Sequence, residues 1–160
     1  MKKLVTFLLA FILGIGAASA QSGTCGDNLT WVLYNNGTLI ISGTGDMYDY
    51  ENIRDVPWYS YNDNIKSVII ESGATSIGNT AFDTCSSLTS IIIPDSVTSI
   101  GDHAFAWCES LQNVTIPDSV TFIGEFAFYS CKSLQNITNP NTVTTRQNQA
   151  FCRCYSIKNI

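Results

Sequence analysis

A 22-residue stretch of this chain recurs almost unchanged 23 positions further on. The segment SLTSIIIPDSVTSIGDHAFAWC, residues 87–108, is followed by SLQNVTIPDSVTFIGEFAFYSC, residues 110–131, and 13 of the 22 positions are identical. Weaker copies occupy residues 64–85 and 133–154. Repetition at a short fixed period is typical of a solenoid, in which each unit is too small for its own core and buries apolar residues against its neighbours.

The copies share columns of apolar residues at equivalent positions. These columns are Ile65, Leu88, Leu111, Leu134 and Ile157; Val68, Ile91, Val114, Ile137 and Ile160; Ile77, Ile100 and Ile123; Ala81, Ala104, Ala127 and Ala150; Phe82, Phe105, Phe128 and Phe151; and Cys85, Cys108, Cys131 and Cys154. We expect all six columns to point into one core that runs along the solenoid axis.

Within one unit, the spacing of apolar residues predicts a short strand near Ser90–Ile93 with alternate side chains inward. Pro94 ends this strand because it lacks a backbone N–H donor, and Gly101 permits a corner. We expect one or two helical turns between Asp102 and Ser110, with Asp102 as the N-cap.

The period lies in the range of leucine-rich repeats. The unit form SL..I.IPDSVT.IG..AF..C resembles the BspA-like leucine-rich repeat family of bacterial and protist surface proteins. Upstream, CGDNLTW.L..GTL.ISGTGDM.DY followed by PWYSY resembles the leader segment that precedes the repeats in that family. The resemblance implies an α/β, strand-dominated leucine-rich repeat solenoid with short strands and short helical or irregular returns, preceded by a β-hairpin cap.

The first twenty residues have the pattern of a secretory signal peptide. MKK is basic, residues 4–18 are apolar, and Ala18-Ser19-Ala20 is a small-residue cleavage site. Cys25 is not directly behind that site, which argues against a lipid anchor. We therefore predict cleavage after Ala20 and a secreted or cell-surface location, without stable membrane insertion.

Residues 21–63 lack the repeat. The alternation around Asn36-Gly37 predicts a hairpin with strands at Leu29–Tyr34 and Thr38–Ser42. The following segment is rich in aromatic residues, namely Tyr48, Tyr50, Trp58, Tyr59 and Tyr61. We interpret 21–63 as a cap over the apolar end of the first repeat; the alternative for these aromatic residues is a patch that stacks on sugars.

The predicted solenoid spans residues 64–160, with about four 23-residue units. Its last unit is degenerate, because Asn139, Arg146 and Gln147 replace residues of the repeat pattern. Such a unit fits a solubilising cap, yet a fifth unit begins and stops at Ile160. The sequence leaves open a minimal chain closed by this unit or a truncated product of a longer adhesin.

Charge argues against nucleic acid and anionic membranes as partners. Eight basic residues oppose thirteen acidic ones, and cleavage would remove Lys2 and Lys3. The chain has no basic cluster, which nucleic-acid binding requires.

Six cysteines in an exported chain suggest disulfides first. However, four of them hold one inward column, where a thiol acts as a small apolar residue. We favour a ladder of free thiols over disulfides between rungs. We expect Cys152 to face solvent and not to pair with Cys25 in the cap. No metal site is predicted at Cys152 and Cys154, because no histidine or second cysteine pair lies near in sequence.

No catalytic constellation is evident, and we predict that the chain is not an enzyme and needs no cofactor. The single histidine, His103, shares a freely varying column with Thr80, Phe126 and Gln149, which indicates an exposed loop. The recurring Asp95-Ser96 pair follows a proline and is interpreted as a β-turn.

What remains is the outward face of the strands. Its predicted residues are Lys66, Thr89, Gln112 and Gln135; Ser67, Ser90, Asn113 and Asn136; and Ile69, Ile92, Thr115 and Thr138. A merely solvated sheet is the alternative. The neighbouring isoleucines Ile69 and Ile92 favour binding, because exposed apolar neighbours mark interaction sites.

We therefore predict an exported protein-binding or adhesion module at the cell surface; by the family resemblance, its partners would be host matrix or cell-surface proteins. The alternative is a structural spacer or self-assembling unit that associates through the unpaired strand at its C-terminal edge.

Overall fold

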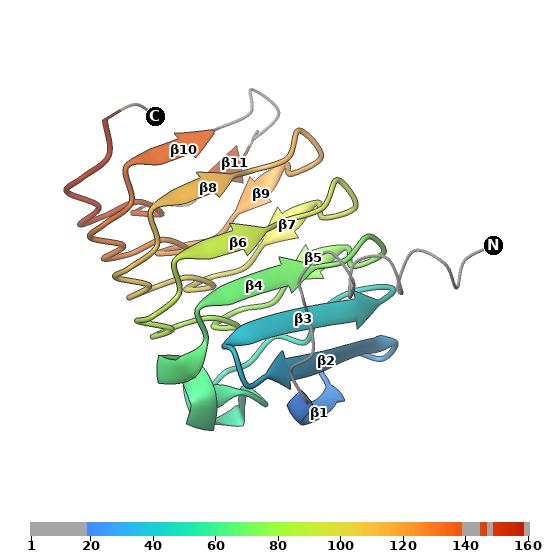
Figure 1. Ribbon diagram of the computed structural model, residues 1–160. Helices are drawn as coiled ribbons and strands as arrows, with labels where there is room; N and C mark the ends of the chain where they lie inside the picture. Colours follow the sequence, from blue (N-terminus) through green and yellow to red (C-terminus); the bar gives the residue numbers. More distant parts are fainter. Residues whose placement is uncertain (1–18, 139–144, 147–148, 159–160) are drawn as a thin grey trace.

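The computed structural model describes residues 19–138, 145–146 and 149–158. Over these residues the chain is a strand-dominated, leucine-rich-repeat-like solenoid, with successive turns stacked along one axis (Figure 1). The helices in this part of the chain are two 3-10 segments, η1 (Ile53–Asp55) and η2 (Tyr59–Asn64). The predicted fold class is confirmed in its strand-dominated, irregular-return form.

The N-terminal strands form an antiparallel meander. β1 (Ser19–Thr24) pairs with β2 (Leu29–Tyr34), and β2 pairs with β3 (Thr38–Gly43). Gly37 has a φ of +86° and its N–H donates to the carbonyl of Tyr34, so the turn needs the conformational freedom of glycine. The predicted signal peptide lies outside the described residues apart from Ser19 and Ala20, and its cleavage stays a prediction.

The hairpin joins the repeat strands in one seven-stranded sheet. β3 pairs in parallel with β4 (Ser67–Ile70), and β6 (Ser90–Ile92), β8 (Asn113–Thr115) and β10 (Asn136–Thr138) follow, also in parallel. The order is β1-β2-β3-β4-β6-β8-β10, as Figure 1 shows. The role of residues 21–63 as a cap stays a prediction, but this segment is continuous with the sheet of the repeats.

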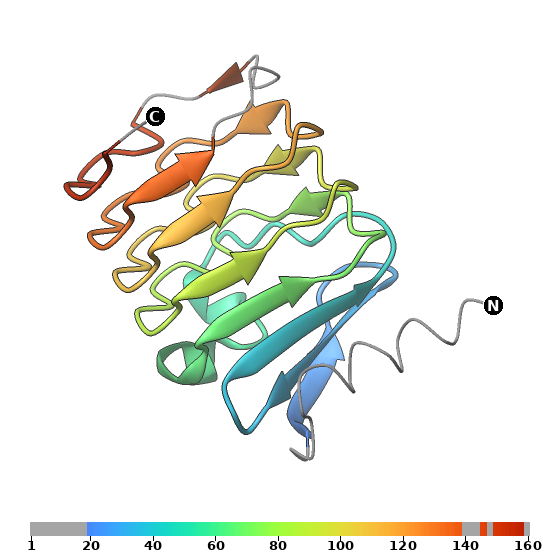
Figure 2. The same cartoon turned by 45° about the horizontal axis from the view of Figure 1, so that its top comes forward.

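A second, narrower sheet lies behind the first (Figure 2). It contains β5 (Ser76–Ile77), β7 (Ser99–Ile100), β9 (Phe122–Ile123) and β11 (Thr145–Arg146), all parallel. Arg146 pairs with Ile123 in register, so it occupies the isoleucine column, as the alignment of repeats predicts. Asn139 and Gln147, the other departures from the repeat, lie outside the described residues.

The turn between the two sheets has the predicted β-turn form. The N–H of Val97 donates to the carbonyl of Pro94, which closes the turn over Asp95-Ser96. The hydroxyl of Ser96 accepts from the N–H of Gly73, and that of Ser119 donates to the carbonyl of Val97. These serines therefore tie each turn of the solenoid to the one before it.

The predicted helical turns between Asp102 and Ser110 are wrong. These return loops are irregular and bond to the next turn instead: the N–H groups of His103, Phe105 and Trp107 donate to carbonyls 22 residues later. The Asp102 carboxylate likewise accepts from the N–H of Glu125 rather than capping a helix. Bonds between turns satisfy the backbone groups that a local helix would have satisfied.

The return loops also contain regularly placed left-handed residues. Each described loop has two of them, four residues apart, and none is glycine: Thr80 and Thr84, His103 and Trp107, Phe126 and Ser130, Gln149 and Arg153. Left-handed backbone costs on the order of 1 kcal/mol for such residues, so the stacking of turns must impose it.

The core is a column of aromatic rings inside the solenoid. Trp58 stacks on Phe82 at a centroid distance of 5.4 Å, and Phe82, Phe105, Phe128 and Phe151 continue the stack at 5.1–5.3 Å. Trp58 thus occupies the phenylalanine position one turn before the first repeat. Its indole N–H donates to the carbonyl of Ala81 at 2.8 Å, which binds the aromatic segment to that repeat.

Candidate partner-binding surface

The outer face of the seven-stranded sheet is set by the alternation of strand residues. Val68, Ile91, Val114 and Ile137 point inward and are buried, whereas Ser90, Ile92, Asn113, Thr115, Asn136 and Thr138 are exposed on the outer face. This arrangement matches the prediction for β6, β8 and β10. Partner binding by this face stays a prediction.

The strand register brings aliphatic side chains into one row across this face. Val32 pairs with Ile40, Ile40 with Ile69, and Ile69 with Ile92. We call these four residues the aliphatic row. The two later repeats have Thr115 and Thr138 at the position of Ile92, so the row changes from aliphatic to threonine along the axis.

The prediction that Ile69 is exposed is wrong. Its exposure is 8%, against 60% for Ile92. Ile69 lies between Ile40 and Ile92 in register, and these neighbours flank it on both sides. The sequence analysis missed Val32 and Ile40 because the hairpin lies outside the repeat. The alternation of residues along the two hairpin strands could have placed both side chains on the outer face. Ile92 is therefore the exposed end of a longer apolar row.

Polar side chains flank the aliphatic row. In one flanking row, Asn136 Nδ2 donates to Asn113 Oδ1 at 2.8 Å, and Ser67 is half-buried where its hydroxyl donates to Thr38. Beyond it, Lys66, Thr89, Gln112 and Gln135 are all exposed, as predicted. The Thr89 hydroxyl donates to the carbonyl of Lys66. The face therefore combines a short apolar row with amide and hydroxyl groups that offer hydrogen bonds.

The aromatic residues of the N-terminal segment divide into buried and exposed ones. Trp58 and Tyr50 are buried, and Tyr59 and Tyr61 pack against the core. Tyr48 is exposed, and its hydroxyl donates to Asp27 at 2.8 Å. Packing within the segment, the favoured interpretation, therefore accounts for four of the five aromatic residues.

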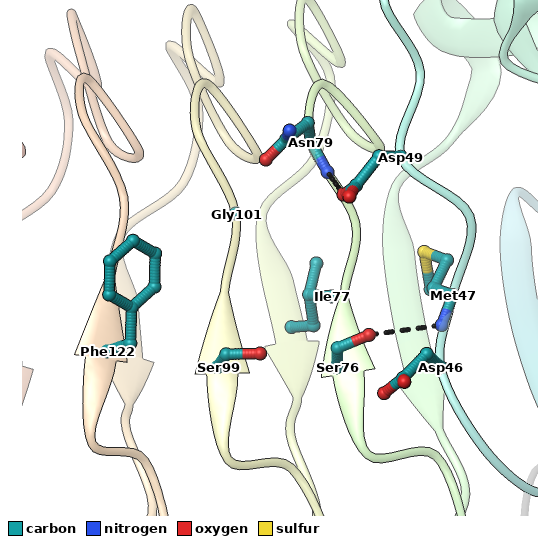
Figure 3. Close-up of a pocket in the computed structure, with 9 residues that line it drawn as sticks. All are labelled: Asp46, Met47, Asp49, Ser76, Ile77, Asn79, Ser99, Gly101 and Phe122. Carbon is teal, nitrogen blue, oxygen red and sulfur yellow. Dashed lines mark hydrogen bonds between the residues drawn. The ribbon is translucent and has the colours of Figure 1, made fainter.

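A groove on the second sheet contains two carboxylates, Asp46 and Asp49, near opposite ends (Figure 3). It is lined by Asp46, Met47, Asp49, Ser76, Ile77, Asn79, Ser99, Gly101 and Phe122. Asp49 accepts from the N–H of Asn79 at 2.8 Å, and Asp46 accepts from the hydroxyl of Thr75. Each carboxylate thus links its own segment to the neighbouring turn of the solenoid, which is a structural role for both.

The column cysteines are free thiols that bridge the turns. Cys108 Sγ donates to the carbonyl of Phe82 at 3.1 Å, Cys131 to Phe105 at 3.2 Å, and Cys154 to Phe128 at 2.9 Å. Burial raises the pKa of the Cys85 and Cys108 thiols well above the ordinary value. These bonds support the predicted thiol ladder, since each sulfur donates to a carbonyl of the preceding turn.

The two remaining cysteines differ in their surroundings. Cys25 is buried, and burial raises its pKa to about 12. The prediction that Cys152 faces solvent holds only in part, because Cys152 is half-buried and Ala106 of the same column is fully buried. Adjacent turns cover both sides of each loop, which explains the burial in that column.

His103 lies in an exposed return loop, as predicted. Its ring stacks on Phe126 at a centroid distance of 5.2 Å. Within the described ranges, no three His, Cys, Asp or Glu side chains converge to hold a metal ion, and no helix is long and apolar enough to cross a membrane.

Comparison with known proteins decides the family. A family profile described as BspA type leucine-rich repeat region (6 copies) matches residues 52–160, more than half of the chain. The chain belongs to the BspA-type leucine-rich repeat family. This BspA-type repeat region includes every copy found by the sequence alignment and begins upstream of them, within the aromatic segment.

Solved structures of bacterial leucine-rich repeat proteins resemble this BspA-type chain. A leucine-rich repeat protein from Eubacterium ventriosum ATCC 27560 is 32% identical, with a TM-score of 0.68 over 88% of this chain and 44% of that protein. The T. pallidum leucine-rich repeat protein is 29% identical, with a TM-score of 0.60 over 84% of this chain and 68% of that protein. The chain therefore spans less than half of the first of these relatives.

A search of curated proteins found no match. Fold and family thus rest on the repeat profile and on the solved structures.

Proposed function

We propose that this BspA-type chain is exported and acts as a protein-binding module at the cell surface, through the outer face of the seven-stranded sheet. The observation that supports this most strongly is the aliphatic row, which ends in Ile92 at 60% exposure. Isolated exposed apolar residues are ordinary, but a row that continues into neighbouring strands favours a partner.

The composition of the face fits a protein partner better than a charged polymer. Apolar residues lie beside Asn113, Asn136 and Gln112, which can donate and accept hydrogen bonds, and Lys66 supplies an exposed positive charge. Protein interfaces combine an apolar centre with a polar rim in this way. Repeat proteins present extended binding surfaces of this kind.

Export is supported by the basic, apolar and small-residue pattern of residues 1–20. Cleavage after Ala20 would leave Gln21–Thr24 still able to pair with β2, since these four residues pair with Thr30–Leu33. The partner class that follows from the family resemblance is a host matrix or cell-surface protein.

The proposal is tested by measuring binding of the secreted chain to immobilised matrix proteins and to host cells. An Ile92→Glu/Gln112→Glu variant places two charges on the outer face. A Thr98→Glu/Thr121→Glu variant is the matched control, because both threonines are exposed beside the second sheet.

We expect saturable binding that is lost in the first variant and retained in the control. Equal binding by both variants would reject the outer face as the site. Concentration-dependent association of the chain with itself, without binding to any host protein, would favour the self-assembling alternative.

A further inference from the structure

A second surface with the features of a ligand site lies on the return loops, away from the outer sheet face. It is a groove of about 390 Å³ that crosses three successive turns, on the side where the loops stack at the left of Figure 1. Its lining residues are His103, Trp107, Phe126, Tyr129, Gln149, Cys152 and Arg153. The volume is within the range of small-ligand sites.

Aromatic rings form the floor of this groove. Phe126 and Tyr129 meet edge to face at 5.4 Å, and Trp107 meets Tyr129 in the same way at 5.4 Å. Trp107 is 39% exposed, whereas the other two tryptophans, Trp31 and Trp58, are buried. An exposed indole fixed by its neighbours offers an apolar surface at little cost in side-chain entropy.

The groove carries positive charge on an acidic chain. The Arg153 guanidinium lies 5.4 Å from the centroid of the Tyr129 ring, and no carboxylate pairs with it in the part of the chain that the structure describes. Lys132, 5.9 Å from the Trp107 ring, is by contrast paired with Glu109 at 2.6 Å. The half-buried carboxylate of Asp83 interacts electrostatically with His103. Arg153 is thus free to take a carboxylate.

The backbone at this surface is already occupied. The N–H groups of Phe105, Trp107 and Ser130 donate to carbonyls of the following turn. An extended peptide that binds by main-chain pairing needs a free strand edge. The return-loop groove has no such edge and presents side chains instead. The chemistry favours a ligand recognised by ring stacking and by side-chain hydrogen bonds.

We propose that the return-loop groove binds a carboxylated sugar, such as a sialic or hexuronic acid residue of a glycan. The apolar face of the pyranose ring would lie on Trp107. Arg153 would pair with the carboxylate in the two-pronged geometry that guanidinium groups favour. Gln149 and His103 would hydrogen-bond to hydroxyl groups. This inference does not depend on the proposed function, because it concerns a different surface.

Titration with 3′-sialyllactose and with a glucuronic-acid-containing tetrasaccharide tests the proposal, read out by tryptophan fluorescence. Lactose, which lacks the carboxylated residue, is the matched ligand control. Because Trp31 and Trp58 are buried, we expect a saturable fluorescence change that arises from Trp107 and that lactose does not produce. Bound sugar should also slow the alkylation of Cys152, compared with a Cys152→Ser variant.

Two variants separate the site from general folding. Arg153→Gln should weaken binding about tenfold or more, the size expected for a lost charge-assisted hydrogen bond, and Arg153→Lys should restore part of it. Lys66→Gln removes the same charge on the other face and should bind as the unmodified chain does. Trp107→Ala should remove the fluorescence change, with circular dichroism as the check on folding.

Absence of saturable binding by either acidic sugar would overturn the proposal, as would equal binding of lactose. Binding that Arg153→Gln leaves unchanged would overturn it too. If an acidic peptide binds the groove and the sugars do not, the site belongs to a protein ligand and the sugar assignment is wrong.

Discussion

The left-handed residues of the return loops show how stacking dominates local preference. Ser130 has a φ of +59°, is buried, and its hydroxyl has no hydrogen-bond partner. Its N–H nevertheless donates to the carbonyl of Cys152 in the next turn. The bond between turns thus holds a residue in a backbone conformation that suits glycine better.

We therefore predict that Ser130→Gly stabilises the chain by about 1 kcal/mol, because it relieves the positive φ and removes an unpartnered buried hydroxyl. Urea denaturation measures the change in the free energy of unfolding. Ser130→Ala separates the two causes, since it removes the hydroxyl and keeps the Cβ. A Ser130→Gly variant less stable than Ser130→Ala would contradict this explanation.

Asp83 is the acidic residue whose environment opposes its charge. Burial raises its pKa to about 6, against the lowering effects of the His103 charge and of a hydrogen bond from the Thr84 backbone. One of its oxygens is buried without a partner. Because the folded pKa exceeds the unfolded value, the folded state holds more protons between about pH 4 and pH 6, and stability falls as the pH rises through that window.

Asp83→Asn should consequently raise the free energy of unfolding at pH 7 by about 1 kcal/mol, a figure reduced for partial solvent screening. It should also flatten the dependence of the melting temperature on pH between pH 4 and pH 6. The exposed Asp95 provides the control as Asp95→Asn, which should change neither quantity. An unchanged pH profile in Asp83→Asn would show that this carboxyl does not control stability there.

At the scale of one turn, the aromatic column is the main shared element. Phe82, Phe105 and Phe128 each contact the rings before and after them, and Trp58 extends the stack into the N-terminal segment. Each turn therefore has little core of its own and depends on its neighbours, as expected for repeat proteins.

Phe105→Ala should cost about 3–5 kcal/mol, the usual cost of removing a buried phenylalanine, because it breaks the stack on both sides. Phe122, half-buried on strand β9 of the second sheet, provides the comparison as Phe122→Ala, with an expected loss of about 1 kcal/mol or less. The free energy of unfolding in urea gives both values. Similar losses of unfolding free energy in the two variants would mean that the aromatic column contributes no more to stability than a half-buried surface ring.

The sequence predicted the repeated elements well, because each column recurs and its burial is dictated by the period. Leu88, Ile91 and Phe105 are inward for that reason. The return loops were misjudged, since a helix cap at Asp102 is a local preference and the bond to Glu125 forms only when turns stack. The burial of Ile69 was missed because Ile40, its partner in register, lies in a hairpin without the repeat.

The groove on the return loops was also beyond sequence reasoning. Trp107, Tyr129 and Arg153 come from three different copies and from columns that vary freely. The parallel register places these variable positions side by side, so neighbouring repeats build a surface that none of them contains alone. Variable columns are where a solenoid can acquire specificity without disturbing its core.

At the scale of the whole molecule, the two proposed binding surfaces lie on separate sides of the core, which is built from residues that recur in every repeat. The outer sheet face carries an apolar row flanked by hydrogen-bonding side chains, and the return loops carry aromatic rings with a positive charge. We propose the first as the site for a protein partner and the second as the site for an acidic sugar.

The most direct test of the central proposal changes the length of the aliphatic row and measures the dissociation constant for a bound host protein. Ile92→Thr shortens the row by placing there the residue found in the next two repeats, and Thr115→Ile lengthens it. Both substitutions keep a β-branched residue in a strand. We predict weaker binding for Ile92→Thr, by about tenfold, and tighter binding for Thr115→Ile. Dissociation constants that stay the same in both variants would contradict the outer face as the binding surface.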